Sequence, residues 1–214
     1  MNFTCVPWIF KMRIFFPVSL NLIGRKCVVI GAADDREAIE KEAALREAGA
    51  DVQWIQDVTV LRETSGRLEQ CVADAFFVIS TPYDAELSAH LRQLADKHRF
   101  LLCCIDQPKY GFVAMAAIAK AGPVRIAIST AGLAPRVGKI LKNAVQRAMD
   151  ATFVRFIEHV AGERERVARE HPAPEESSIR REAMIELADG FKADVSFTYP
   201  EWFTDPERFD DAER

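Results

Sequence analysis

An acid and two hydroxyls follow two apolar runs of this chain. Asp106 comes directly after the run 101–105, and Ser129 and Thr130 follow the run 124–128. In an open parallel sheet, polar groups just beyond the carboxyl ends of the strands line the ligand crevice. If both runs are strands of one such sheet, the three side chains face one cleft. A carboxylate there could exchange a proton with a ligand that the hydroxyls hydrogen-bond.

Each of these side chains also has a purely structural interpretation. Aspartate commonly caps a turn ahead of a proline, and Pro108 stands two residues after Asp106. Ser129 and Thr130 could cap the helix that is expected to begin near Pro135. Both interpretations stay open at this point.

Five short apolar runs predict the scaffold that positions these residues. They begin at intervals of about 25 residues, the length of a strand with its crossover helix. The segments between them carry helical spacing, except for 56–75, which reads as a loop with a short helix. Residues 113–120 read as a short apolar helix. We therefore expect an α/β fold, a Rossmann-type doubly wound parallel sheet over residues 12–133. The runs are 27–30, 52–55, 76–79, 101–105 and 124–128.

After Pro135 the pattern becomes helical throughout. Apolar stripes at helical period run through 137–149, 153–160 and 179–191, with a loop at 171–178. We expect residues 134–214 to form a smaller helical region, and residues 1–11 to be an extension to which no function is assigned. The first and third stripes carry too much apolar surface to stay wet, so a homodimer is predicted.

Composition excludes several classes of function. Hydrophobic residues make up 49% of the 214 residues, charged ones 28%, and the formal net charge is -4. An acidic balance gives no electrostatic case for nucleic acid or for an anionic membrane as a partner. The five cysteines show no disulfide framework, which favours a reduced, cytoplasmic protein. The four histidines have no ligand spacing, so no metal site is expected.

The residues around the predicted cleft resemble a known family. The run Ile105-Asp106-Gln107-Pro108 is similar to Val-Val-Asp-Asp-Pro, and 126–135, Ile-Ala-Ile-Ser-Thr-Ala-Gly-Leu-Ala-Pro, is similar to Ile-Ala-Ile-Ser-Thr-x-Gly-x-Ser-Pro. Both runs are typical of the precorrin-2 dehydrogenases, which include the N-terminal module of siroheme synthase. The resemblance implies oxidation of precorrin-2 to sirohydrochlorin with NAD in siroheme biosynthesis. Ferrochelatase activity, which some members have, is left open.

The resemblance also implies roles for individual residues. Asp106 matches the essential acid of the family and is the expected general acid/base. Ser129 and Thr130 are expected to bind the polycarboxylate substrate, together with the basic residues Lys109 and Arg136. Thr81 and Pro82 lie in a stretch that is near the cofactor in the family. Asp84 in the same stretch is equally well explained as the N-cap of the following helix.

The turn after the first strand departs from the family. The family run is Val-Val-Gly-Gly-Gly-x-Val-Ala-x-Arg-Lys, whereas Gly31 is here followed by Ala32, Ala33, Asp34 and Asp35, with two additional residues in the turn. These five residues are the expected cofactor-binding turn. Two acids oppose the charge of a pyrophosphate, so NAD is expected to bind more weakly than in a family member with three glycines.

Acids at this turn and after the second strand each have two interpretations. Asp34 and Glu37 fit a capping box, in which side chains satisfy the amides at the start of the helix. Asp57, two residues past the second strand, could hold the adenosine ribose or act as a turn aspartate.

Two rival functions follow from the departures. One is a degenerate, non-catalytic homologue that binds a tetrapyrrole, and the other is an NAD-sensing regulatory domain. The altered turn favours the first rival. Gln107 replaces the second acid of the family, so one carboxylate is missing. The match at Asp106 favours the enzyme.

Overall fold

The computed structural model describes residues 15–59 and 66–204, so the predicted extension 1–11 lies outside the described residues. The chain divides into two compact units, Met1–Ala148 and Met149–Arg214. This division falls later than residue 134, where the sequence places the start of the helical region. The first long helix after the sheet therefore stays with the first unit.

The core of the first unit is a parallel sheet of four strands in the order β2-β1-β3-β4. The order reverses between β1 and β3, which is the switch point where an open α/β sheet binds its ligands. Four of the predicted strands are thus confirmed, and with them the doubly wound α/β fold. The strands are β1 Lys26–Ile30, β2 Asp51–Ile55, β3 Phe77–Ser80 and β4 Leu101–Cys104.

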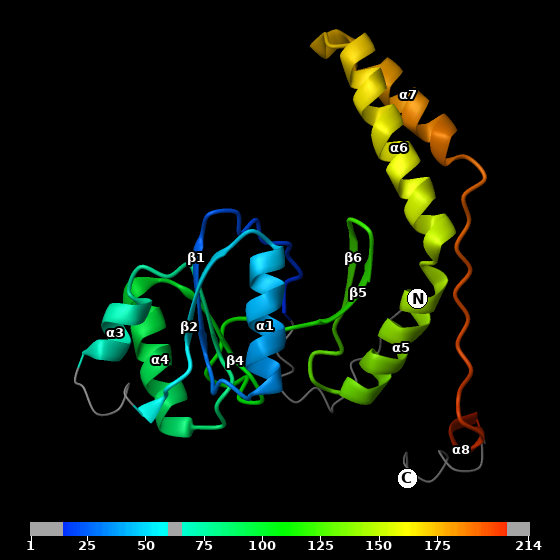
Figure 1. The fold of residues 1–214 in the computed structure, drawn as a ribbon. Helices are drawn as coiled ribbons and strands as arrows, with labels where there is room; N and C mark the ends of the chain where they lie inside the picture. The colour runs from blue at the N-terminus through cyan, green and yellow to red at the C-terminus, as the bar shows by residue number, and fades with distance from the viewer. Residues whose placement is uncertain (1–14, 60–65, 205–214) are drawn as a thin grey trace, which may run out of the picture. The chain divides into compact units, whose positions relative to one another are not determined.

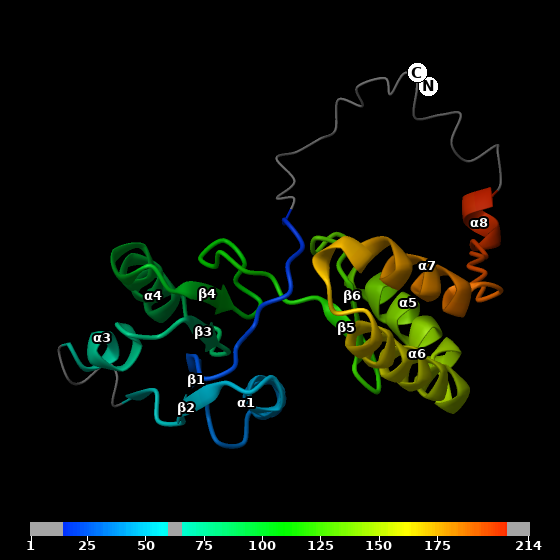
Figure 2. The ribbon, with the colours of Figure 1, turned by 90° about the horizontal axis from the view of Figure 1, so that it is seen from above.

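Helices cover both faces of this sheet. Helix α1, Arg36–Glu47, lies on one face, and α3, Arg67–Val72, lies with α4, Ala85–His98, on the other (Figures 1 and 2). Successive strand residues alternate between the two sides, so Cys103 packs toward α1 and Cys104 toward α4. The Asp84 carboxylate accepts hydrogen bonds from the first amides of α4, which confirms its N-cap role.

The fifth predicted strand is not part of the parallel sheet. Strand β6, Val124–Ile128, pairs antiparallel with β5, Ala117–Ala121, in a separate two-stranded hairpin. The prediction of a short helix over 113–120 is therefore wrong, and so is the prediction of a fifth parallel strand. Figure 1 shows this hairpin apart from the four-stranded sheet.

Local chemistry explains the hairpin. Ala121 pairs with Val124, so only Gly122 and Pro123 connect the strands, and Gly122 has a φ of 52°. Glycine at the first central position of a two-residue turn is a signature of β-hairpins. The short connection leaves no room for the crossover that parallel pairing needs.

Helix α5 and helix α1 hold the hairpin within the first unit. In α5, Pro135–Ala148, the Gln146 side chain exchanges hydrogen bonds of 2.9 and 2.7 Å with the backbone of Lys120 in β5. At the end of α1, Glu47 forms ion pairs with Lys120 and Arg125, both at 2.5 Å. These two cations keep the pKa of Glu47 below its usual value.

The second unit is helical. Helix α6, Ala151–Glu170, packs against α7, Ser177–Ala188, and the ring of Phe156 stacks on Phe191 with centroids 5.1 Å apart. Both helices were predicted from their apolar stripes, whereas the short elements η1, Pro174–Glu176, and α8, Glu201–Thr204, were not. Within the described part of the chain, no helix has the length and apolar character that crossing a membrane requires.

Candidate functional site

The carboxyl edge of the parallel sheet brings three predicted site residues to one level. Ile30 pairs with Ser80, and Ser80 pairs with Cys104. Gly31 and Thr81 therefore directly follow the neighbouring strands β1 and β3 at the same height. Asp106 comes two residues after the end of β4. This is the edge at which ligands of open α/β sheets bind.

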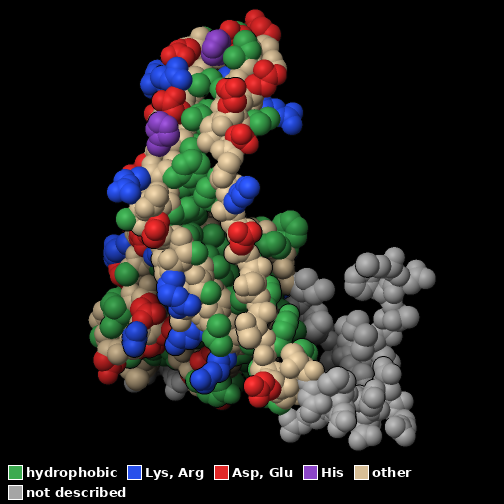
Figure 3. All heavy atoms as spheres, turned by 90° about the vertical axis from the view of Figure 1, so that its right-hand side faces the viewer, with side chains coloured by type: hydrophobic (Ala, Val, Ile, Leu, Met, Phe, Trp, Pro, Cys, Tyr) green, Lys and Arg blue, Asp and Glu red, His purple; other side chains and the backbone are tan. Residues whose placement is uncertain are grey.

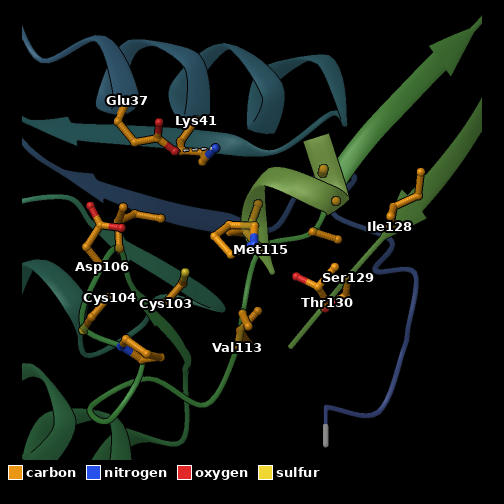
Figure 4. A pocket seen from close by; sticks show the side chains of 17 residues that line it. Glu37, Lys41, Cys103, Cys104, Asp106, Val113, Met115, Ile128, Ser129 and Thr130 are labelled. Atoms are coloured by element: carbon orange, nitrogen blue, oxygen red, sulfur yellow. Dashed lines mark ion pairs between the residues drawn. The ribbon is translucent and has the colours of Figure 1, made fainter. Parts of the chain in front are cut away.

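A cavity of about 350 Å³ opens beside this edge within the first unit. Figure 4 shows the side chains around it: Glu37 and Lys41 extend from α1, Asp106 lies with Cys103 and Cys104 at the end of β4, and Ser129 and Thr130 follow the hairpin. The prediction that Asp106 and the two hydroxyls line one cleft is therefore confirmed. The route differs, because the hydroxyls follow β6 of the hairpin rather than a fifth parallel strand.

The backbone and surroundings of Asp106 do not match a turn cap. Backbone groups hold the turn itself, since the Gln107 amide donates to Cys104 at 3.2 Å and the Tyr110 amide donates to Gln107 at 3.1 Å. Among the described residues the Asp106 carboxylate accepts no hydrogen bond and forms no ion pair. Its φ of 57° lies in the left-handed region, which aspartate and asparagine tolerate better than most residues. The carboxylate is thus exposed and available to a ligand.

Ser129 and Thr130 do not cap α5. The Ser129 hydroxyl accepts a hydrogen bond from the Ala131 amide at 3.2 Å, whereas α5 begins only at Pro135. The methyl group of Thr130 lies against Gly138, where an added Cβ would sit 3.4 Å away. The hydroxyls are therefore set by the loop between β6 and α5, on the wall of the cavity.

Asp35, and not Asp34, caps the helix at the predicted cofactor turn. The Asp35 carboxylate accepts a hydrogen bond from the Glu37 amide at 2.9 Å and another from the Thr81 hydroxyl. The Thr81 hydroxyl is the main cause that lowers the pKa of Asp35, and backbone amides of α1 add to it. The expected capping box of Asp34 and Glu37 is wrong, because the helix starts one residue later than it requires and leaves Asp34 exposed.

Gly31 is required by crowding from the chain itself. A Cβ built at this position would collide with the Thr81 hydroxyl, lie 2.8 Å from the Ala38 Cβ and lie 3.3 Å from the Asp35 carboxylate. The space in front of this glycine is thus filled by side chains, where a glycine-rich turn would admit a pyrophosphate. Gly31, Asp35 and Thr81 lie together, as the prediction of a cofactor-binding turn requires. The Asp35 carboxylate, however, occupies the space beside Gly31 and Thr81.

Gln107 joins two turns of the carboxyl edge. Its side chain is buried, and its amide donates to the carbonyl of Pro82 at 3.3 Å. An ionised aspartate, which the family has here, has no proton to donate and would repel this carbonyl oxygen. Glutamine in place of the family's aspartate therefore removes a negative charge. It adds a neutral hydrogen bond between the turns after β3 and β4.

The cavity is not lined by Asp57, Lys109 or Arg136, nor by the predicted cofactor residues of 31–35 and 81–82. Asp57 accepts from the Thr59 amide at 3.0 Å and from its hydroxyl at 2.5 Å, the geometry of a turn aspartate. The Lys109 ammonium lies 4.7 Å from the centroid of the Tyr110 ring. Arg136 is exposed on α5, and neither basic residue lines the cavity.

Lys41 is a cation that lines the cavity and was not predicted from the sequence. Lys41 forms an ion pair of 2.7 Å with Glu37, and its side chain is only 19% exposed. The signal was present, because Ala38 and Lys41 keep the spacing of Ala-x-Arg-Lys at the end of the family run. Among the described residues, no cluster of three or more histidine, cysteine or acidic side chains could hold a metal ion.

Cys103 on the cavity wall is expected to be chemically inert. Burial raises its pKa to about 12, so the thiolate that reacts with alkylating agents is nearly absent at about pH 8. Iodoacetamide should label the segment with Cys103 and Cys104 only after urea is added, as read by mass spectrometry of peptides. Rapid labelling of Cys103 in the folded protein would contradict this burial.

Comparisons with known proteins find sequences similar to this chain. The family described as putative NAD(P)-binding matches residues 18–117. A siroheme synthase of Thioalkalivibrio sulfidiphilus is 27% identical over 189 residues, which cover 82% of this chain and 37% of that protein. A precorrin-2 dehydrogenase of Methanosarcina barkeri is 26% identical over 183 residues, which cover 73% of this chain and 81% of that protein.

A solved structure shares the fold. SirC, a precorrin-2 dehydrogenase, superposes with a TM-score of 0.60 and 18% sequence identity, covering 82% of this chain and 90% of its own. The chain spans about a third of the length of the siroheme synthases that it matches.

Proposed function

We propose that the chain is a member of the family of precorrin-2 dehydrogenases and N-terminal siroheme synthase modules, and that it oxidises precorrin-2 to sirohydrochlorin with NAD. One observation carries the proposal. Asp106 presents an unpaired carboxylate to a cavity at the carboxyl edge of a dinucleotide-type sheet, opposite the hydroxyls of Ser129 and Thr130. A cytoplasmic site of action is part of the proposal, and the four described cysteines are free thiols.

The proton chemistry falls to Asp106. Oxidation of precorrin-2 removes a hydride from carbon and a proton from the ring system, and the bound nicotinamide supplies the hydride acceptor. The carboxylate oxygens of Asp106 would take up that proton. Ser129 and Thr130 would orient the substrate by hydrogen bonds to its carboxylates.

The turn from Gly31 to Asp35, with Thr81 and Pro82, would hold the cofactor. Its position at the switch point and at the start of α1 fits a dinucleotide. The Asp35 carboxylate, however, already takes the amide of Glu37 and the hydroxyl of Thr81. The turn therefore fits NAD with weakened binding of the pyrophosphate.

The Asp35 carboxylate, which occupies the phosphate-binding turn, favours a second candidate function. A homologue that binds a tetrapyrrole in the cavity without oxidising it needs Asp106, Ser129 and Thr130 but not an open phosphate site. In that case the chain would bind the substrate with or without NAD.

Turnover of the purified protein separates the two. The unmodified chain, mixed with freshly prepared precorrin-2 and NAD, should form sirohydrochlorin, followed by absorbance, and a parallel reaction with NADP establishes the preferred nicotinamide. Binding of the tetrapyrrole without any oxidation by either cofactor would favour the non-catalytic homologue.

We expect the chain to assemble as a homodimer. Apolar side chains are exposed on α5 at Val137 and Ile140, and on α7 at Ile179 and Ile185. Figure 3 shows such hydrophobic groups among charged side chains at the surface. Surface of this kind is typically covered by a partner. Light scattering at micromolar concentration should give twice the mass of one chain, and the mass of a monomer would contradict the proposal.

A further inference from the structure

Lys41 differs from the other cations of helix α1. Arg36 and Arg46 also pair with acids one turn away, but their side chains are 91% and 57% exposed. The Lys41 side chain is 19% exposed and reaches the cavity beside Asp106 (Figure 4). Within the described chain, it is the one lysine or arginine that lines this cavity.

The charge of the cavity gives Lys41 a task. Glu37 and Asp106 contribute two carboxylates to the lining, so without Lys41 every charged group of the lining would repel an anionic ligand. The Lys41 ammonium has three N–H donors. The ion pair with Glu37 at 2.7 Å does not use all three. Glu37 therefore holds the ammonium at the cavity wall while leaving donors for a ligand.

We propose that Lys41 binds a carboxylate of the tetrapyrrole in this cavity, with Glu37 as the residue that positions it. This inference rests on the proposed function, because that function supplies a polycarboxylate substrate. The competing source of anionic oxygens is the phosphate of the cofactor. A charge-assisted hydrogen bond in a partly buried site is strong enough to change affinity measurably.

The test compares Lys41→Gln with Lys139→Gln, a matched change at an exposed lysine of α5 that does not line the cavity. The probe is uroporphyrin, a stable tetrapyrrole with carboxylates on every pyrrole, whose binding is followed by its fluorescence. Lys41→Gln should weaken uroporphyrin binding about tenfold, while Lys139→Gln leaves it unchanged. The dependence of binding on salt should also become shallower in Lys41→Gln.

Two further arms distinguish the role of Lys41. If Lys41 only stabilises α1 through its ion pair, Glu37→Gln should weaken uroporphyrin binding as much as Lys41→Gln; ligand binding instead predicts a clearly smaller loss for Glu37→Gln. Calorimetric titration with NAD tests whether Lys41 binds the cofactor phosphate instead. If Lys41→Gln weakens the binding of NAD but not of uroporphyrin, the proposal is overturned. Equal uroporphyrin affinity in Lys41→Gln and Lys139→Gln would overturn it as well.

Failure of the proposed function leaves a different pattern. If the unmodified chain binds uroporphyrin through Lys41 but never oxidises precorrin-2, the dehydrogenase is wrong and the role of Lys41 stands. If it oxidises precorrin-2 and Lys41→Gln does so with an unchanged KM, the role of Lys41 is wrong.

Discussion

Asp106→Asn is expected to slow the oxidation of precorrin-2 by a factor of about 10² to 10⁴, the usual contribution of a general acid or base. Asparagine keeps the size of the side chain and also tolerates the left-handed φ of 57°. It removes only the group that can take a proton. The melting temperature should stay unchanged, since the Asp106 carboxylate makes no hydrogen bond or ion pair among the described residues.

The choice of variant matters because of the backbone at Asp106. Alanine in the left-handed region costs about 1–2 kcal/mol, so Asp106→Ala would mix lost chemistry with lost stability. Asp106→Gly is the better second variant, because glycine adopts this φ without strain. Rates are measured under single-turnover conditions with saturating NAD. Full activity in Asp106→Asn would reduce this residue to a turn position and move the proposal toward the non-catalytic homologue.

The sequence was sufficient for the elements whose pattern is local. Buried parallel strands read as unbroken apolar runs, and both ends of all four were located to within one residue. Asp106 was placed correctly for the same reason, because it follows such a run directly. The long amphipathic helices of the second half were equally visible from their period.

The features that could not be predicted depend on contacts between segments that are distant in the sequence. Val124–Ile128 reads as apolar, yet it is mostly exposed, because its partner is β5 rather than the sheet. The choice of Asp35 over Asp34 as the cap depends on Thr81, which is 46 residues away. Lys41 was not singled out, because its place on the cavity wall depends on segments far from it in the sequence, among them β4 and the loop before α5.

Asp35→Asn is the change expected to improve NAD binding, by about two- to fivefold, the effect of a like charge at the start of a helix. The sequence predicts that both Asp34 and Asp35 oppose the pyrophosphate. Asp35 is the acid that caps α1, so we expect its charge to have the larger effect. Replacement by glycine would remove the cap together with the charge. Asparagine caps helices as well as aspartate does and keeps an acceptor for the Glu37 amide.

The pH dependence follows from the direction of the pKa shift. Because the folded pKa of Asp35 is lowered, its carboxylate adds stability above its unfolded pKa of about 3.9, and this stability is lost as the pH falls through the folded pKa. At neutral pH the acid is fully ionised. The gain in NAD affinity should therefore be constant between about pH 6 and 8.

Calorimetric titration with NAD checks this result, with Asp34→Asn as the matched control. Asp34 is exposed and carries the same charge one residue away, so its replacement should have a smaller effect than that of Asp35. Equal gains in the two variants would mean that general charge, and not the cap position, limits binding. Unchanged or weaker binding in Asp35→Asn would show that the internal carboxylate does not compete with the pyrophosphate, and the cause of any weak NAD binding would then lie in the lost glycines.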